Sequence, residues 1–141
     1  MRPLAWAVVS LGLLVAAPTA GLAQQGRPGG AVELHRNYPN PFNPETWIPF
    51  TLDQSLFADG RKPVVSLKIY NVLAQLVAVP ILQGSGEPLD NLALAWNGTG
   101  RYTGYWEGKY SNGREAPSGV YVYQIVVNGR EKQSQKMTII K

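Results

Sequence analysis

The chain has 141 residues, of which 45% are hydrophobic and 16% charged, a composition typical of a folded globular domain rather than a disordered chain. It contains no cysteine, which excludes disulfide frameworks, cysteine-ligated metal sites and thiol nucleophiles. The formal net charge of +4 is spread along the sequence without a basic block, so we expect no nucleic-acid partner.

The first 23 residues have the features of a bacterial export signal. Arg2 supplies a positive charge, residues 4–17 are predominantly apolar, and small residues at Gly21 and Ala23 suit a signal peptidase. The apolar run is shorter than the roughly 20 residues of a transmembrane helix, although a retained N-terminal anchor is the alternative. We predict a cleaved signal helix over residues 1–23 and export to the periplasm, the cell surface or the medium, with no membrane span after cleavage.

Two further segments precede the expected strands. Residues 24–33 are polar and rich in glycine, so we expect a flexible leader, followed by one folded domain over residues 34–141. The lead-in (residues 37–46) carries prolines at 39, 41 and 44, which fix their own φ and favour an extended residue before each. We expect this rigid segment to lie across the domain with Tyr38 and Phe42 buried. A polyproline recognition ligand is the alternative.

Short apolar runs separated by turn residues predict an all-β domain. Ile48, Phe50 and Leu52 alternate with other residues, as in a half-buried strand. Because Pro49 within this run cannot donate a hydrogen bond, we predict that the strand lies at a sheet edge or carries a bulge. Residues 65–69 give a second alternating strand.

The remaining strands follow the same pattern. Residues 76–81 predict a third strand that stops or bends at Pro80. Residues 120–127 are apolar on both faces except for Gln124, which fits a central strand covered on both sides, or one whose outer tyrosines pack under a loop.

A C-terminal hairpin completes the predicted domain. Asn128 and Gly129 both tolerate positive φ and favour a type I′ turn, after which residues 132–140 return with Met137 and Ile139 on one face. Short strands at this spacing predict an all-β, Ig-like two-sheet antiparallel β-sandwich.

Four sequence blocks then follow one another in a fixed order: residues 37–50, residues 65–77, residues 106–123, and the end of the chain. Their distinctive residues are Asn37, Pro39, Asn40, Pro41, Phe42, Asn43, Pro44, Ile69, Tyr70, Asn71, Trp106, Gly108, Gly113, Pro117, Ser118, Gly119 and Tyr121, with Lys136 and Lys141 at the end. Over residues 34–141 the chain resembles the FlgD-like Ig domain of flagellar hook-capping proteins and the C-terminal sorting domains of the type IX secretion system.

The resemblance implies an Ig-like fold and a partner in the outer-membrane secretion machinery or elsewhere in the envelope. For a sorting domain, it implies recognition of the final strand with Lys136 and Lys141. Two departures stand out. Ala74 occupies a turn position where the family usually has glycine, which costs about 1 kcal/mol if φ is positive there. Residues 83–104 form a longer connection than usual, with an additional Trp96-Asn97-Gly98.

Large aromatic residues concentrate between positions 96 and 110. Trp106 is predicted to be a core residue whose indole N–H bonds to backbone. Trp96, Tyr102 and Tyr105 are candidates for stacking on sugar rings, as in a carbohydrate-binding module. The alternative is that these aromatics pin the long connection onto a sheet.

The chain offers no recognisable catalytic set. His35 is its single histidine, and the nine carboxylates show neither a glycosidase-like pair nor a calcium-loop spacing. We therefore predict a non-enzyme without metal or cofactor.

Three functions remain open at this point. A sorting signal would normally follow cargo, and only the short leader separates it here from the signal peptide, so the gene is either a truncated remnant or encodes the module as product. A standalone structural or adhesive module and a carbohydrate-binding module are the other two. The sequence fixes neither a partner nor an oligomeric state.

Overall fold

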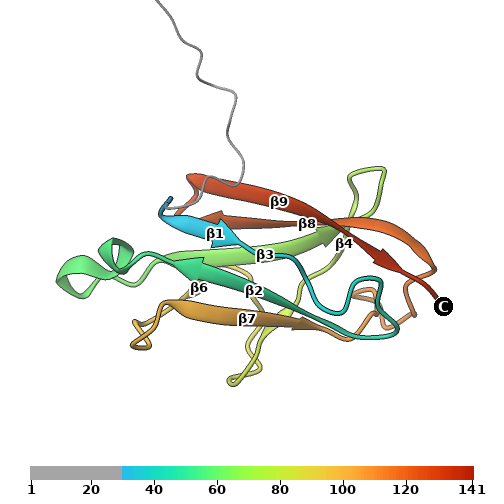
Figure 1. The fold of residues 1–141 in the computed structure, drawn as a ribbon, viewed down its shortest axis with the longest axis horizontal. Coiled ribbons are helices and arrows are strands. Elements are labelled where there is room, and N and C mark those ends of the chain that lie inside the picture. Colours follow the sequence, from blue (N-terminus) through green and yellow to red (C-terminus); the bar gives the residue numbers. More distant parts are fainter. Residues whose placement is uncertain (1–29) are drawn as a thin grey trace, which may run out of the picture.

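Alternating apolar residues build two antiparallel sheets that pack face to face in the computed structural model, which describes residues 30–141 (Figure 1). The predicted signal helix and the leader up to residue 29 lie outside the described residues. The β2 sheet contains, in spatial order, β1 (Val32–Leu34), β2 (Thr46–Leu52), β7 (Arg101–Trp106) and β5 (Ile81–Leu82). The β8 sheet contains β4 (Leu76–Ala78), β3 (Val64–Tyr70), β8 (Gly119–Val127) and β9 (Glu131–Ile139), with β6 (Leu92–Ala93) paired to β3. A 3₁₀ segment, η2 (Gln54–Gly60), follows β2.

The core lies between the two sheets, where every second residue of the main strands points inward. The predicted period-two patterns of β2, β3 and the C-terminal hairpin are confirmed. The buried set includes Ile48, Phe50, Leu52, Val65, Leu67, Ile69, Tyr123, Ile125, Val127, Met137 and Ile139. Removing this apolar surface from water is the main source of stability in a domain without disulfides. The predicted Ig-like two-sheet sandwich is therefore confirmed.

The predicted turns are also confirmed by their backbone angles. Asn128 and Gly129 have φ values of 54° and 69° between β8 and β9. Ala74 has a φ of 62°, so alanine occupies the left-handed position that glycine would take without steric cost. The predicted strand over residues 76–81 is divided at Pro80, because β4 pairs with β3 and β5 pairs with β7 of the other sheet.

Pro49 lies neither in an edge strand nor at a bulge, contrary to the prediction, because β2 pairs in continuous register with β1 on one side and β7 on the other. The Pro49 carbonyl accepts the amide of His35 at 3.0 Å, so the backbone groups of Pro49 face the end of β1. An antiparallel pair would return a second bond to the His35 carbonyl, which proline cannot donate. That carbonyl instead accepts the Tyr123 hydroxyl at 2.7 Å. A side chain from the opposite sheet thus replaces the missing ladder bond.

Three smaller expectations are wrong. Strand β1 begins at Val32, which is buried, so the fold includes the end of the predicted leader. The tyrosines of β8, Tyr121 and Tyr123, are buried between the sheets rather than packed outward under a loop, and the outer face of β8 is half exposed. Tyr38 is 52% exposed instead of buried, whereas Phe42 is buried as predicted.

Candidate functional site

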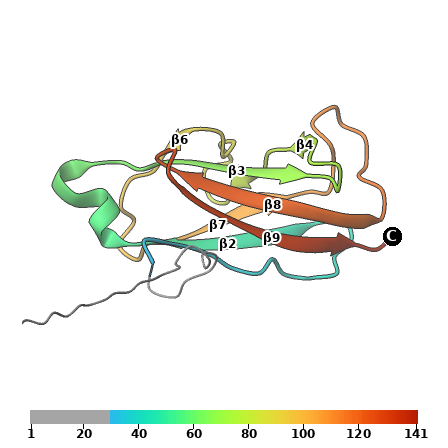
Figure 2. The same cartoon turned by 90° about the horizontal axis from the view of Figure 1, so that it is seen from above.

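Three of the four sequence blocks that carry the family resemblance meet at one end of the sandwich (Figure 2): the lead-in, residues 106–123 and the end of the chain. The ring centroid of Trp106 lies 5.7 Å from that of Phe42 and 5.8 Å from that of Tyr121, both edge to face. These three rings, from the lead-in, β7 and β8, form the terminal cluster together with Ile139 of β9. The η2 segment lies at the opposite end of the molecule (Figure 2).

The lead-in pairs with the last strand along its outer edge. The Asn40 side chain accepts the amide of Thr138 at 3.1 Å. Phe42 donates its amide to the Thr138 carbonyl at 3.0 Å and accepts the amide of Ile140 at 3.2 Å. The peptide bonds before all three lead-in prolines are cis. Through its hydrogen bonds to Thr138 and Ile140, this Asn-Pro segment covers the edge of β9 and fixes the C-terminal residues in place.

Asn37 fastens the beginning of the lead-in. Its buried side-chain amide donates to the Thr46 hydroxyl at 3.0 Å and to the Pro39 carbonyl at 3.2 Å. Its backbone amide donates to the Tyr123 hydroxyl at 2.9 Å. The described contacts of Asn37 are thus internal, which gives this motif residue a structural role.

The turn after β7 closes over the terminal cluster. The indole N–H of Trp106 donates to the Lys109 carbonyl at 2.8 Å, so the predicted core position and backbone bond of Trp106 are confirmed. Gly108 has a φ of 82°, and a Cβ at this position would overlap the Pro44 carbonyl. Only glycine allows this close approach of the two loops. Gly113 has a φ of 90° in the same connection, but a Cβ added there would meet no other atom within 4 Å.

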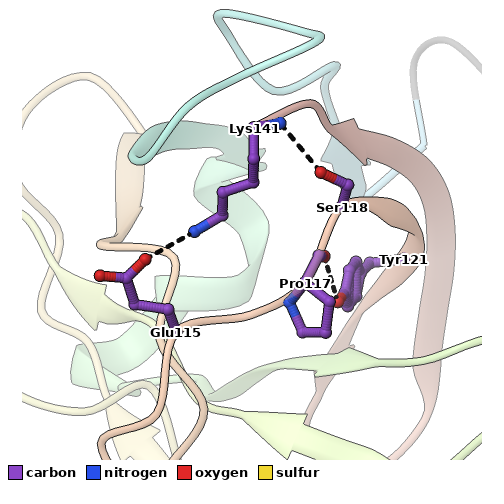
Figure 3. A network of polar contacts seen from close by, with 5 residues as sticks. All are labelled: Glu115, Pro117, Ser118, Tyr121 and Lys141. Atoms are coloured by element: carbon purple, nitrogen blue, oxygen red, sulfur yellow. Dashed lines mark hydrogen bonds and ion pairs between the residues drawn. The ribbon is translucent and has the colours of Figure 1, made fainter.

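The residues that precede β8 hold the last residue of the chain (Figure 3). The Lys141 amide donates to the Ser118 hydroxyl at 2.9 Å, and its ammonium lies 3.0 Å from a Glu115 carboxylate oxygen. The hydrogen bond from the Lys141 ammonium holds the pKa of the Glu115 carboxyl below its usual value. The Tyr121 hydroxyl donates to the Pro117 carbonyl at 2.8 Å, which anchors the Pro-Ser-Gly turn on the cluster.

The two lysines predicted to contact secretion machinery both reach the surface. Lys136 is exposed on β9, and Lys141 is held at the end of the chain with part of its side chain in solvent. The Lys141–Glu115 pair is exposed, so it contributes little to stability and can exchange for another carboxylate at low cost. The arrangement presents positive charge on a rigid terminal strand.

The block around β3 serves the fold in a different way. Ile69 is fully buried, and Tyr70 is half-buried at the end of the strand. The Asn71 side chain accepts the amides of Leu73 and Gln75 at 2.9 and 3.0 Å, which forms the tight turn before β4. Asn71 is therefore a turn residue.

The candidate sugar-stacking residues do not form one exposed platform. Tyr102 is buried and its hydroxyl donates to the Ala95 carbonyl at 2.6 Å. Trp96, 38% exposed, packs edge-on against Phe57 of η2 with ring centroids 5.1 Å apart. These two residues pin the long connection to the end of the sandwich. Tyr105 lies elsewhere, on the outer face of the β2 sheet.

Three contributors to these sites had not been singled out in the sequence: Trp47, Tyr123 and Gln133. Trp47 lies beside Tyr105 on the outer face, with ring centroids 5.4 Å apart. The alternation along β2 could have revealed it, because Ile48 is buried and its neighbour Trp47 must therefore point to the outer face. Tyr123 and Gln133 act through contacts with residues 86 to 101 positions away, which leave no local signal.

Chemical groups for catalysis or metal binding are sparse across residues 30–141. The His35 ring bonds to the Thr51 hydroxyl at 2.8 Å. No three His, Asp or Glu side chains in this part of the chain are arranged to hold a metal ion. Within the same residues, no helix has the length and apolar character to cross a membrane.

Comparisons with known proteins reveal a likeness in fold but no sequence relative. No family model matches the chain. No curated protein matches it either. A part of dimeric latent PorU from Porphyromonas gingivalis has a similar structure, with a TM-score of 0.55, 18% identity, and coverage of 89% of this chain and 10% of PorU. The chain therefore spans about a tenth of the length of PorU.

Two other solved structures have lower scores. PorZ, a surface component of the type IX secretion system of P. gingivalis, gives a TM-score of 0.44 at 16% identity, covering 77% of this chain and 11% of PorZ. The alkylpurine DNA glycosylase AlkC of Pseudomonas fluorescens, bound to abasic-site DNA, gives 0.48 at 19% identity, covering 80% of this chain and 31% of AlkC. The likeness to PorU, at 18% identity, concerns the fold alone.

Proposed function

We propose that this chain is a non-catalytic, exported Ig-like module of the type IX sorting-domain kind, recognised through its C-terminal end. The partner would be outer-membrane secretion machinery or another envelope protein. The observation that carries the proposal is the convergence of the lead-in and of residues 106–123 on the last strand. The side chains of Asn40 and Ser118 accept the backbone amides of Thr138 and Lys141. Phe42 pairs with Thr138 and Ile140 through its backbone.

A rigid terminus suits recognition by a partner. Residues already fixed in the free protein lose little conformational entropy when a partner binds them. The exposed ammonium groups of Lys136 and Lys141 supply charge for an acidic docking surface, and charge complementarity favours both encounter rate and specificity. The buried motif residues hold the C-terminal end in one conformation, and the two lysines contact the partner.

A fusion experiment tests this function. Residues 24–141 are attached to the C-terminus of an exported fluorescent reporter and expressed in P. gingivalis, which has a type IX secretion system. The reporter is expected at the cell surface, whereas the reporter without the domain stays in the periplasm. Combined Lys136→Ala and Lys141→Ala substitution should retain the fusion in the periplasm, without a change of more than a few degrees in melting temperature.

Lys132→Ala is the matched control, because Lys132 is an exposed lysine of the same strand at its far end from the C-terminus. It should leave surface delivery unchanged. A fusion that stays in the periplasm with the wild-type domain rejects the sorting role and favours a structural or adhesive module. Equal loss of delivery with Lys132→Ala would reject recognition at the C-terminal end.

A further inference from the structure

A row of large side chains crosses the outer face of the β2 sheet at one level. Tyr38 of the lead-in is bridged to Trp47 of β2, Trp47 opposes Tyr105 of β7, and Tyr105 opposes Ile81 of β5. Directly opposed residues on neighbouring strands share a face of the sheet. We call Tyr38, Trp47 and Tyr105 the outer aromatic row.

The three rings are next to one another and open to solvent. The Tyr38 and Trp47 ring centroids are 6.1 Å apart with an angle of 19° between planes, and the Trp47 and Tyr105 rings meet at 50°. Tyr38 is exposed, and the other two are half-buried. Because regular strands and the paired lead-in carry these rings, their positions are fixed before any ligand arrives.

A groove of about 450 Å³ lies beside the row, a size within the range of small-molecule sites, roughly 300–1,000 Å³. One wall consists of Trp47 and Tyr105, and the other is the turn over residues 82–86. This turn offers the Gln83 amide and the Ser85 hydroxyl. No charged side chain of the described residues lines the groove.

Local hydrogen bonds hold both walls. The Tyr105 hydroxyl donates to a Glu45 carboxylate oxygen at 2.5 Å, which keeps the ring in one orientation. The backbone amide of Gln83 donates to the Thr103 carbonyl at 2.8 Å, and the backbone amide of Gly86 donates to the Leu82 carbonyl at 2.8 Å, so the Gln83 side chain is not used in these bonds. A Cβ added at Gly84 or Gly86 would meet no other atom within 4 Å, so this turn is not packed against a neighbouring segment at these two positions.

We propose that the outer aromatic row and its groove bind a chain of neutral hexopyranose sugars. A pyranose ring has an apolar C–H face and a rim of hydroxyl groups, which requires an aromatic surface beside uncharged hydrogen-bonding groups. Trp47 and Tyr105 supply the surface, and Gln83 and Ser85 supply the rim contacts. The residues that line the groove offer no ionic partner to a charged ligand, whereas they do offer hydrogen-bonding groups to a neutral one.

This site differs from the one expected in the sequence, since Trp96 and Tyr102 pack around Phe57 and take no part in it. It is also independent of the proposed sorting function, because it lies on the outer face of the β2 sheet and uses neither Lys136 nor Lys141. A negative result for sugar binding therefore leaves the sorting proposal standing, and a negative result for sorting leaves the sugar-binding proposal standing.

Affinity electrophoresis of the purified chain tests the proposal. Native gels contain hydroxyethyl cellulose, galactomannan or mixed-linkage β-glucan, and we expect at least one of them to retard the protein. Trp47→Ala should weaken this binding at least about tenfold, as expected for removal of a central aromatic contact. Trp96→Ala is the matched control, because Trp96 is an exposed tryptophan outside the groove, and it should bind like the wild type.

Trp47→Phe keeps a ring in the row and guards against a folding defect of the alanine variant. It should remain folded and bind with an affinity between those of wild type and Trp47→Ala. Binding should also persist in high salt, since no charged residue lines the groove. The proposal is overturned if none of the three polysaccharides retards the wild type, if Trp96→Ala abolishes binding while both Trp47 variants retain it, or if high salt removes it.

Discussion

Tyr123 joins the two sheets through a single hydroxyl group. The side chain is fully buried, and its hydroxyl donates to the His35 carbonyl while accepting the Asn37 amide. Both partners belong to the segment that leaves β1 and enters the lead-in. The hydroxyl therefore compensates for the bond that Pro49 cannot make and also fixes the start of the lead-in. Burial raises the pKa of Tyr123 to about 12.

This raised pKa predicts a loss of stability at alkaline pH. An unfolded tyrosine has a pKa of about 10. Because the folded pKa is higher, the neutral phenol stabilises the fold fully below about pH 10, and this contribution is lost as pH rises toward about 12. Tyr123→Phe should cost about 1–3 kcal/mol in free energy of unfolding at neutral pH and should weaken the alkaline decline.

Urea unfolding followed by circular dichroism between pH 7 and about pH 12 measures both effects. Tyr105→Phe is a useful comparison, because the Glu45 hydrogen bond raises the pKa of Tyr105 to about 12 on the outer face of the sheet. If Tyr123→Phe declines with pH as steeply as the wild type, the other tyrosines dominate the alkaline transition.

At the scale of elements, the turn after β7 is matched in shape to the lead-in. Gly108 lies against the Pro44 carbonyl, and the Ala116 amide donates to the Gly108 carbonyl at 2.9 Å. The turn thereby connects the lead-in to the segment before β8. Its glycine satisfies two requirements at once, a positive φ and the absence of a Cβ.

A pair of glycine substitutions separates these requirements. Gly108→Ala and Gly113→Ala both place alanine at a positive φ, which costs about 1–2 kcal/mol. Only Gly108→Ala adds an overlap with the Pro44 carbonyl, so it should cost about 1–3 kcal/mol more in free energy of unfolding than Gly113→Ala. Chemical denaturation of the two variants tests this difference. Equal costs would show that the lead-in shifts freely to accommodate a methyl group.

At the scale of the whole molecule, the two sheets are joined along the side where β1 meets β9. The Gln133 side chain accepts the Leu34 amide at 2.8 Å and donates to the Val32 carbonyl at 2.5 Å. Gln135 donates to the Leu34 carbonyl at 3.2 Å. The lead-in continues this cover to the end of β9, so the final strand has partners along its length (Figure 2). Covered edges resist unwanted strand pairing with other chains.

The last four residues should therefore matter for stability more than their terminal position suggests. Deletion of residues 138–141 removes the buried Ile139 and the backbone bonds to Phe42, and should cost at least about 2–5 kcal/mol in free energy of unfolding, as for other large core truncations. Lys141→Ala loses only an exposed ion pair and should change the free energy of unfolding by less than about 1 kcal/mol.

Thermal melts of the two variants measure this contrast. A deletion variant as stable as the wild type would show that the C-terminal residues do not support the fold. They would then be available to a partner as a detachable tail rather than as a rigid end.

Local patterns account for much of the predicted fold. The alternation of Ile48, Phe50 and Leu52 marks β2, because burial on one face repeats at every second residue. Asn128-Gly129 marks the hairpin, because few residues accept positive φ. The interior position of Pro49 was not predictable in the same way, since it depends on Tyr123 from the other sheet.

The candidate sites were predictable only in part. The sequence pointed to Tyr105 and to the importance of the Asn-Pro block, but it grouped Tyr105 with Trp96 and Tyr102 because they are close in the chain. In the fold, Tyr105 has Trp47 and Tyr38 as neighbours instead. Cross-strand register, and not distance along the chain, decides which aromatic rings share a face.

The sequence by itself determined the all-β class, which residues of the main strands face the core, the C-terminal hairpin and the absence of cysteine chemistry. These properties follow from composition and from patterns within a few residues. The tertiary structure alone decided that the lead-in and residues 106–123 meet around the last strand, that Gln133 joins the two sheets, and that an aromatic row faces solvent. Such contacts link residues as many as 101 positions apart, and they arise only when both sheets have paired and packed.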